Sequence, residues 1–187
     1  GRLSLQCRPE SVTPAFLEAA EGVDVCLEFG LQTIHPREGA AVRRHNDLCK
    51  VDAVLADCRE RGLRHEVTPI FGLPEQTLAS FLESVRWCLE RRVPVIKAFP
   101  LMLLRGTELD LHRGQMGYIQ SPGAMAHVIA SGAFSSDDFQ LMARVSEALV
   151  HTEGRHPQDL GALLAIAEQM KADSHRWRPE AQASGGG

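Results

Sequence analysis

The sequence contains no run of about eighteen apolar residues, the length that a membrane-spanning helix needs. No secretory signal precedes the first extended segment. Basic residues are not in excess either, because the net charge is −4 and the isoelectric point is near 6.1. The arginines are scattered among acids and give no continuous field for a phosphate backbone. With 44% hydrophobic residues, the sequence predicts one globular domain, which we expect in the cytoplasm. It indicates no membrane partner and carries no clear nucleic-acid signal.

Cysteines at metal-binding spacing are also missing. The five cysteines are odd in number, and no two of them are separated by two residues; they are Cys7, Cys26, Cys49, Cys58 and Cys88. A free thiol in an apolar periodic segment behaves as a small hydrophobe, so we expect each to pack in the core. Unpaired thiols also suit a reducing compartment. The sequence therefore predicts no metal site within this chain.

What the chain does contain is a strand, a tight turn and a helix in direct succession. The β-favouring run that begins at Val67 stops at a Gly-Leu-Pro turn over 72–74. Thr77 then stands at the N-cap position of an amphipathic helix over 78–89. In sheets built from such units, ligands bind beyond the carboxyl ends of the strands. The turn by itself is more typical of an ordinary connection between a strand and a helix.

Strands and helices alternate through the first part of the chain. We predict strands at 3–7, 23–31, 65–71 and 95–99, and intervening helices that open at the caps Thr13, Asp47 and Thr77, with a shorter one over 36–42. Such alternation favours a parallel sheet with right-handed crossovers. The predicted fold class is α/β, as an open sheet or as part of a barrel.

The character of the sequence changes after Leu109. Residues 112–132 hold four glycines and one proline, which predicts an irregular segment with a short extended piece at 127–130. Ser136 and the acids that follow it predict the start of a helix over 139–150. A second helix is expected over 160–170. We therefore divide the chain into 1–109, an irregular segment with a helical pair over 110–177, and a flexible tail over 178–187.

Four short motifs occur in one order along this chain. They are Leu-Glu-Phe-Gly-Leu-Gln-Thr at 27–33, Arg-Arg-His-Asn at 43–46, Phe-Gly-Leu-Pro-Glu-Gln-Thr at 71–77, and Pro-Leu at 100–101 with Arg-Gly-Thr-Glu-Leu at 105–109. The series resembles the C-terminal half of the radical S-adenosylmethionine core, in the branch typified by oxygen-independent coproporphyrinogen III oxidase and the catalytic subunit of Elongator. The resemblance implies the last four strands of a six-stranded partial (β/α) barrel, followed by a helical C-terminal extension.

The resemblance also implies which residues hold the methionyl end of S-adenosylmethionine. Gln32 matches the glutamine that contacts this portion of the cofactor. Arg44 matches the arginine that pairs with the cofactor's carboxylate, a role that suits a planar guanidinium fork. Gly72 matches the glycine at which the backbone approaches the adenine. Since each stands at or just after the carboxyl end of a predicted strand, we expect Gln32, Arg44 and Gly72 to lie on one rim of the sheet.

The remaining contacts implied by the resemblance surround the adenine. Ile70 would form an apolar wall against the ring. At the end of the fourth strand, the backbone of Phe99, Pro100 and Leu101 would read the adenine edge. An apolar residue at any of these positions is equally expected to serve packing alone.

Two positions depart from the family pattern. Gln6 stands where the coproporphyrinogen-oxidase-like pattern has a glutamate that binds the cofactor's amino group. Thr68 stands where the pattern has an aspartate that binds a ribose hydroxyl. Both residues keep hydrogen-bonding capacity and lose a negative charge. They remain candidate contacts, and the departure implies weaker cofactor binding or a different arrangement of contacts.

The largest departure is the absence of cluster ligands. The resembling enzymes carry three closely spaced cysteines that ligate a 4Fe-4S cluster, and this chain has no such triplet. We therefore interpret the chain as a fragment whose partner is the missing N-terminal half of the barrel. The implied activity of the parent protein is reductive cleavage of S-adenosylmethionine to a 5′-deoxyadenosyl radical that acts on an unknown substrate. No catalytic residue is assigned to this chain.

Two other functions stay open at this point. A non-redox α/β-barrel enzyme of the aldolase type would use Lys97, near the end of a predicted strand, to form a Schiff base if burial depressed its pKa. Alternatively, the chain is a non-catalytic remnant or interaction module that keeps the fold without the chemistry. The sequence carries no motif that identifies a substrate.

Overall fold

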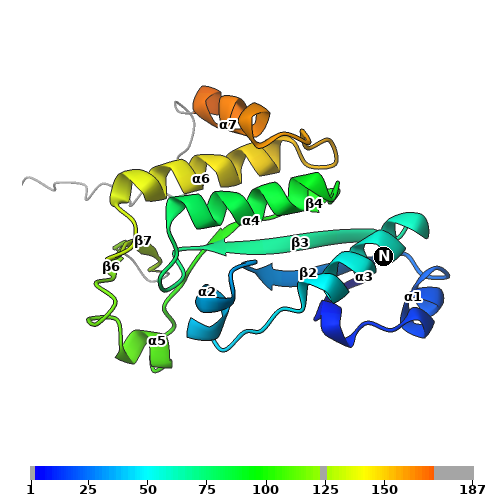
Figure 1. Ribbon diagram of the computed structural model, residues 1–187, viewed down its shortest axis with the longest axis horizontal. Helices are drawn as coiled ribbons and strands as arrows, with labels where there is room; N and C mark the ends of the chain where they lie inside the picture. Colours follow the sequence, from blue (N-terminus) through cyan, green and yellow to red (C-terminus); the bar gives the residue numbers. More distant parts are fainter. Residues whose placement is uncertain (1–2, 123–125, 171–187) are drawn as a thin grey trace, which may run out of the picture.

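Parallel strands form the centre of the computed structural model, which describes residues 3–122 and 126–170 (Figure 1). The strands of the main sheet are β1 (Leu3–Cys7), β2 (Val25–Gln32), β3 (Arg64–Phe71), β4 (Val95–Ile96) and β5 (Phe99–Pro100). β1 to β4 pair in chain order, β5 pairs with β3, and every pair is parallel. Within the described residues the sheet is open, as a partial (β/α) barrel requires.

Three of the helices between the strands begin at the predicted caps, namely α1 (Pro14–Ala20), α3 (Leu48–Glu60) and α4 (Leu78–Glu90). The other helices of this region are the 3-10 helix η1 (Pro9–Ser11) and α2 (Pro36–Ala41). The side chains of Thr13, Asp47 and Thr77 each accept a hydrogen bond from a backbone N–H in the first turn of their helix. Ser80 also bonds back to the N–H of Thr77, which completes a capping box.

The two faces of the sheet have different environments. Along β2, buried residues alternate with partly exposed ones. Leu27, Phe29 and Leu31 have no exposed surface and belong to the core. The opposite face of β2, which includes Glu28 and Gln32, remains partly open to solvent. This open polar face is where a ligand can reach the sheet.

The fourth predicted strand, 95–99, is divided in two. Val95–Ile96 and Phe99–Pro100 are separate short strands. At the interruption the N–H of Lys97 still donates to the carbonyl of Val67, and the carbonyl oxygen of Ala98 accepts a 2.7 Å hydrogen bond from the Ser146 hydroxyl. β2 also differs from its predicted bounds of 23–31. The N–H of Val25 bonds to the carbonyl of Val23 in a turn, so the strand begins two residues late.

The C-terminal part adds a short hairpin and two helices. Its elements are α5 (Glu108–Leu111), β6 (Ile119–Gln120), β7 (Val128–Ala130), α6 (Ser136–His151) and α7 (Leu160–Gln169). Figure 1 shows α6 lying along α4, with α7 on its other side. The ring of Phe71 in β3 lies 5.4 Å from Phe81 of α4 and 5.5 Å from Phe139 of α6, centroid to centroid. The helical pair is therefore part of the same core as the sheet.

The first turn of α6 differs from the prediction by one residue. Ser135, and not Ser136, is the N-cap of α6; its hydroxyl accepts from the N–H of Asp138, whose carboxylate accepts from the N–H of Ser135. The tail predicted over 178–187 lies outside the described residues. Among the described residues, no helix combines the length and the apolar character needed to cross a bilayer.

A histidine joins the α6–α7 connection to the edge of the sheet. Nε2 of His156 accepts a 3.0 Å hydrogen bond from the N–H of Ile96, and Nδ1 lies 2.8 Å from the hydroxyl of Thr152. That hydroxyl itself donates to the carbonyl of Ala148, so Nδ1 carries the proton and Nε2 is the acceptor. Protonation of Nε2 removes the bond to Ile96. Burial accordingly lowers the pKa of His156, although Glu153 opposes the shift.

This arrangement predicts loss of stability at acidic pH. Because the folded-state pKa of His156 is depressed below its ordinary 6.5, the unfolded chain binds more protons as the pH falls through that range. The free energy of unfolding is therefore expected to be greatest above pH 6.5 and to decrease below it. Urea unfolding as a function of pH measures this. His156→Gln keeps an acceptor without a titrating ring and should flatten the dependence of the free energy of unfolding on pH. The same dependence in both proteins would assign the effect to His65, because burial also lowers the pKa of that histidine.

Candidate functional site

A polar cavity opens where the first strands of the sheet approach their carboxyl ends. It has a volume of about 340 Å³ and is lined by Gln6, Cys7, Arg8, Glu28, Gly30, Gln32, Arg44 and Thr68. We call it the Arg44 pocket. Four of the residues selected from the sequence, Gln6, Gln32, Arg44 and Thr68, come together here from β1, β2, the segment after α2, and β3. This is the end of a parallel α/β sheet at which ligands bind.

Gln32 is held in an unusual backbone conformation at this pocket. Its φ is +64°, in the left-handed region that a residue with a side chain adopts only at a cost. The β2–β3 register shifts between Phe29 and Gln32, where β2 contains one more residue than β3. The amide of Asn46 fixes this end of β2 by donating to the carbonyls of Leu31 and Thr33, at 2.7 and 2.9 Å. Such strain together with a bulge is typical of a functional position.

Arg44 lies over the end of β2, as the sequence predicted. Its guanidinium donates to the carbonyl oxygen of Gly30, and a Cβ added to Gly30 would lie 3.2 Å from the guanidinium nitrogen. Burial lowers the pKa of Arg44, and the charge of Arg8 lowers it further. The Nε of Arg44 and the Oε1 of Gln32 are both buried without a hydrogen-bond partner among the described residues. A donor and an acceptor left unsatisfied at one pocket indicate a site completed by a ligand or water.

The residues predicted to surround the adenine form a neighbouring group and do not line the Arg44 pocket. Ile70 is paired with Phe99 in the β3–β5 register. Gly72, just past the end of β3, has a φ of +91°, and an added Cβ would meet the Cβ of Leu101 at 3.5 Å. The backbone conformation at position 72 therefore requires a glycine. The N–H of Leu101 donates to the carbonyl of Phe71, so this donor is not available to a ligand.

A buried hydrogen-bond network, which we call the Gln76 network, connects these segments. Gln76 has no exposed surface; its Oε1 accepts from the N–H groups of Gly72 and Leu73, at 2.7 and 3.2 Å. Its Nε2 donates to the carbonyl of Ile70 at 3.0 Å and to the carboxylate of Glu38 at 3.3 Å. The side chain thus fixes both sides of the turn after β3.

Glu38 carries the network to the end of β2. It is 3% exposed, and its carboxylate accepts a 2.6 Å hydrogen bond from the hydroxyl of Thr33, the residue that follows Gln32. Sequence reasoning missed Thr33, Glu38 and Gln76 as members of the site. The only signal was their occurrence within or near the quoted motifs, and nothing in the spacing indicated that they touch.

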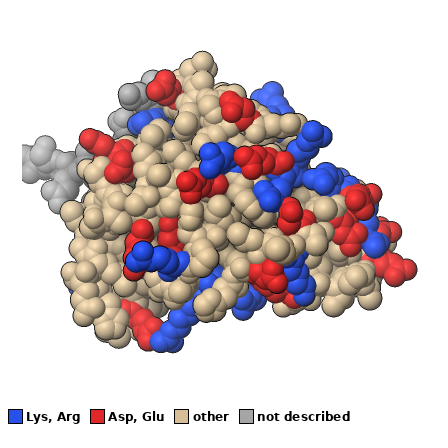
Figure 2. Space-filling model, viewed as in Figure 1, with Lys and Arg blue, Asp and Glu red and all other residues tan. Residues whose placement is uncertain are grey.

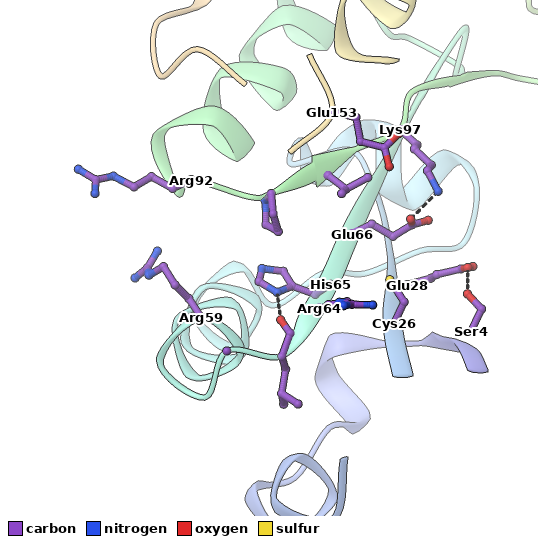
Figure 3. Close-up of a pocket in the computed structure, with 14 residues that line it drawn as sticks. Ser4, Cys26, Glu28, Arg59, Arg64, His65, Glu66, Arg92, Lys97 and Glu153 are labelled. Atoms are coloured by element: carbon purple, nitrogen blue, oxygen red, sulfur yellow. Dashed lines mark hydrogen bonds and ion pairs between the residues drawn. The ribbon is translucent and has the colours of Figure 1, made fainter. Parts of the chain in front are cut away.

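A second, larger cavity lies at the amino ends of the strands (Figure 3). Its volume is about 540 Å³, and its lining includes residues at or near the starts of β2, β3 and β4. Figure 3 shows Lys97 reaching toward Glu66, with a 2.5 Å ion pair, and Ser4 toward Glu28. The hydrogen bond to Glu66 raises the pKa of the Lys97 ammonium. A Schiff-base lysine needs the opposite shift, so this contact does not support the aldolase-type interpretation.

The cysteines are not arranged for metal binding. Within residues 3–122 and 126–170 no group of three or more histidine, cysteine, aspartate or glutamate side chains is placed to hold a metal ion. Cys58 and Cys88 are buried as predicted, and burial raises their pKa values to about 11 and about 12, away from the thiolate form. Cys49 contradicts the prediction, because it lies on the exposed side of α3.

Charges of both signs are interspersed on the face of the molecule seen in Figure 2. Many form exposed ion pairs. Arg43, next to Arg44, does not line the Arg44 pocket and pairs with Glu108 of α5 at 2.5 Å. This face therefore presents no continuous basic surface.

Comparison with solved structures identifies the class of fold. The sheet and its helices have the fold of part of a radical S-adenosylmethionine enzyme. The radical S-adenosylmethionine methyltransferase TsrM from Kitasatospora setae, solved with cobalamin and a 4Fe-4S cluster, matches 66% of this chain and 24% of its own, with 18% identity and a TM-score of 0.57. The archaeal Elp3 of Methanocaldococcus infernus matches 61% of this chain and 28% of its own, with 15% identity and a TM-score of 0.53. The fold inferred from the sequence is thus confirmed.

Curated relatives are similar over little more than half of the chain. An uncharacterised protein of Methanocaldococcus jannaschii is 24% identical over 113 residues, which cover 58% of this chain and 35% of the relative. The protein YhcC of Escherichia coli is 31% identical over 110 residues, covering 56% of this chain and 36% of the relative. The matched region thus spans about a third of the length of these relatives. No family model matches the chain.

Proposed function

We propose that this chain is the distal part of a radical S-adenosylmethionine enzyme and that the Arg44 pocket binds the methionyl end of the cofactor. The observation that carries the proposal is the convergence of Gln6, Gln32, Arg44 and Thr68 on one cavity, with the Nε of Arg44 and the Oε1 of Gln32 buried and unsatisfied. An arginine fork complements a carboxylate, and the amide of Gln32 offers a donor and an acceptor to the adjoining amino acid backbone.

The chain's own residues bind and orient the cofactor in this proposal. Arg44, held against the carbonyl of Gly30, presents its charge at the end of β2, and the bulge directs Gln32 into the same cavity. Ile70 of β3 and Gly72 just past its end continue the rim toward the adenine, and the Gln76 network links that rim to the end of β2. S-adenosylmethionine, once bound and reductively cleaved, supplies a 5′-deoxyadenosyl radical for hydrogen abstraction.

The 4Fe-4S cluster of such enzymes does not fit the residues of this chain. The described residues contain no set of ligands for it, and burial raises the pKa values of the Cys58 and Cys88 thiols, which disfavours the thiolate that ligates iron. We assign the cluster ligands to the N-terminal half of the barrel, which we propose as the partner of this chain. Substrate and reaction outcome belong to that complete protein.

Removing Arg44 tests the proposal directly. Arg44→Ala is expected to weaken S-adenosylmethionine binding by about tenfold to a hundredfold, since a hydrogen bond to a charged group contributes about 1.5–3 kcal/mol. Isothermal titration of the chain with S-adenosylmethionine measures the affinity. Arg43→Ala is the matched control, because Arg43 is the adjacent arginine and pairs with Glu108 outside the pocket. Equal affinities for the two variants would remove the assignment and leave the non-catalytic module as the better interpretation.

A further inference from the structure

The larger cavity, at the amino ends of the strands, lies outside the proposed cofactor site, and we call it the amino-end cavity. Besides His65, its charged and titratable lining residues come from α3, β2, β3 and the segments after α4, β4 and α6; they are Arg59, Cys26, Glu28, Arg64, Glu66, Arg92, Lys97 and Glu153. Lys97 pairs with Glu66, and Arg64 pairs with Asp24. Arg59 and Arg92 are exposed and form no ion pair with a described residue. The cavity therefore has two cationic groups that are free to hold an anion.

The two helices that flank this cavity end in the same way. A residue with left-handed backbone follows each of them, Gly62 after α3 with a φ of +65° and Arg92 after α4 with a φ of +52°. Its N–H and that of the next residue donate to carbonyls of the last helical turn. Glycine is preferred at this position because a side chain is strained there. Arg92 thus occupies its position at a cost to folding, which is typical of a residue kept for function.

A buried histidine presents an unpartnered nitrogen to the same cavity. His65 is 5% exposed, and its Nδ1 lies 2.9 Å from the carbonyl oxygen of Leu63, so Nδ1 carries a proton. The other nitrogen, Nε2, has no hydrogen-bond partner in the described part of the chain. Figure 3 shows the ring on the side of the cavity where Arg59 and Arg92 extend. Because buried polar atoms are normally hydrogen-bonded, Nε2 indicates a ligand between His65 and the two arginines.

Guanidinium groups from two separate segments suit a tetrahedral oxyanion. A carboxylate has two oxygens in one plane, and a single arginine fork can occupy both, whereas a phosphate group has oxygens in several directions. Such a group also suits His65. Burial lowers the pKa of His65, and the charge of Arg59 lowers it further, while the hydrogen bond to Leu63 opposes the shift. An anion beside Arg59 counteracts the effect of that charge, so Nε2 can take up a proton and donate to the anion.

The rest of the cavity limits what the phosphate can be attached to. In Figure 3, Glu28, Glu66 and Glu153 lie on the opposite side of His65 from Arg59 and Arg92. These acids repel a second anionic group and accept hydrogen bonds from hydroxyl groups. The cavity volume of about 540 Å³ leaves room for more than one phosphate group. The lining therefore favours a single phosphate on a small body that carries hydroxyl groups.

We propose that the amino-end cavity binds the phosphate group of a small hydroxylated phosphate ester through Arg59, Arg92 and His65. The arginines supply the positive charge, and His65 becomes protonated as the anion binds. Basic residues near the end of a helix also offset its dipole. That role accounts for Arg59 in the last turn of α3, but not for the strained backbone of Arg92 or the unpartnered nitrogen of His65.

The pH dependence of sulfate binding tests the part assigned to His65. Sulfate is tetrahedral and keeps its charge through this range, and equilibrium dialysis with the radiolabelled ion, at constant ionic strength, measures its affinity. Because binding raises the pKa of His65, the unaltered chain should bind sulfate about tenfold more tightly at about pH 6 than at about pH 8. His65→Asn keeps a donor near Leu63 without a titrating ring and should remove this difference. His156→Gln is the control and should retain it, since Nε2 of His156 is already bonded to Ile96.

Replacing Arg92 by glycine separates binding from folding. Arg92→Gly relieves the left-handed strain, so its urea midpoint should equal or exceed that of the unaltered chain. Its sulfate affinity should nevertheless fall about tenfold, because one charged contact is lost. Arg86→Gln is the charge control, since Arg86 pairs with Glu90 on α4 and does not line the cavity. Equal sulfate affinities for Arg92→Gly, Arg86→Gln and the unaltered chain would overturn the site.

Two further outcomes decide the proposal. Sulfate affinity that is the same at both pH values in the unaltered chain would contradict the role of His65. Ribose 5-phosphate and inorganic phosphate are then compared as competitors of sulfate at about pH 8, where both are mainly dianions. Ribose 5-phosphate should displace sulfate at the lower concentration, because its hydroxyl groups reach the acids of the cavity. The reverse order would show that the arginines bind a free anion only and that the assignment of a phosphate ester is wrong.

Discussion

Replacing Gln76 by leucine is expected to lower the free energy of unfolding by about 3–5 kcal/mol. Leucine has a similar size but cannot accept from the N–H groups of Gly72 and Leu73 or donate to Ile70 and Glu38. Both N–H groups lie in a buried turn, and each unsatisfied donor costs about 1–3 kcal/mol. The buried carboxylate of Glu38 also loses a donor. Urea unfolding measures the change.

The control for this substitution is an exposed glutamine. Gln115 lies on the surface, and its side chain makes no hydrogen bond to another described residue. Gln115→Leu should change the free energy of unfolding by no more than about 0.5 kcal/mol. A loss of similar size in both variants would show that the Gln76 network contributes little.

A charge swap within the network gives a stricter test. Glu38→Gln combined with Gln76→Glu keeps one amide and one carboxylate in contact, and the carboxylate at position 76 can still accept from Gly72 and Leu73. The double variant should be more stable than Gln76→Glu alone, in which two buried carboxylates face each other. Additive losses would mean that Glu38 and Gln76 act independently.

Much of the fold was predictable because its signals are local. The caps Thr13, Asp47 and Thr77 stand immediately before their helices, and each was recognised from residue type and position alone. The strands were predicted from apolar periodicity, which depends on neighbours in sequence. Their bounds were less accurate around Ala98, whose carbonyl is bonded to Ser146, 48 residues away, a contact that periodicity does not reveal.

The site was predictable only in part. Gln32 and Arg44 were selected because they match motifs, and the structure brings them to one pocket. Gln76 stands inside one of those motifs yet was assigned no role, since its partner Glu38 is 38 residues distant. Glu28 lines the same pocket and was not selected, because its pairing with Gln6 depends on strand register, which no spacing along the chain reveals. Pairings across the sheet therefore limit what the sequence alone can predict.

The chain by itself is expected not to cleave S-adenosylmethionine. Because the described residues provide no cluster ligands, anaerobic reconstitution with iron and sulfide should leave the chain without a 4Fe-4S cluster. Incubation with dithionite and S-adenosylmethionine should then yield no 5′-deoxyadenosine. Stoichiometric iron together with turnover would show that the five cysteines include an unrecognised site.

Supplying a segment that carries the cysteine triplet should change this result completely. Among the described residues β1 pairs only with β2, and Leu3 at its start is 49% exposed, so the outer edge of β1 is open to another strand. The chain alone should therefore associate into oligomers through this edge, which size-exclusion chromatography detects. A co-expressed N-terminal half, or one continuous longer chain, should cover the edge and give a monodisperse complex.

That complex is the form in which cofactor cleavage should appear. Deoxyadenosine formation should rise from background to multiple turnovers and should depend on Arg44 if this residue holds the cofactor's carboxylate, as we propose. Arg43→Ala in the same complex should retain the yield, since that arginine lies outside the pocket. A complex that binds its cluster and remains monodisperse, but cleaves S-adenosylmethionine equally well with Arg44→Ala, would place the cofactor elsewhere. In that case the chain would complete the barrel without holding its cofactor.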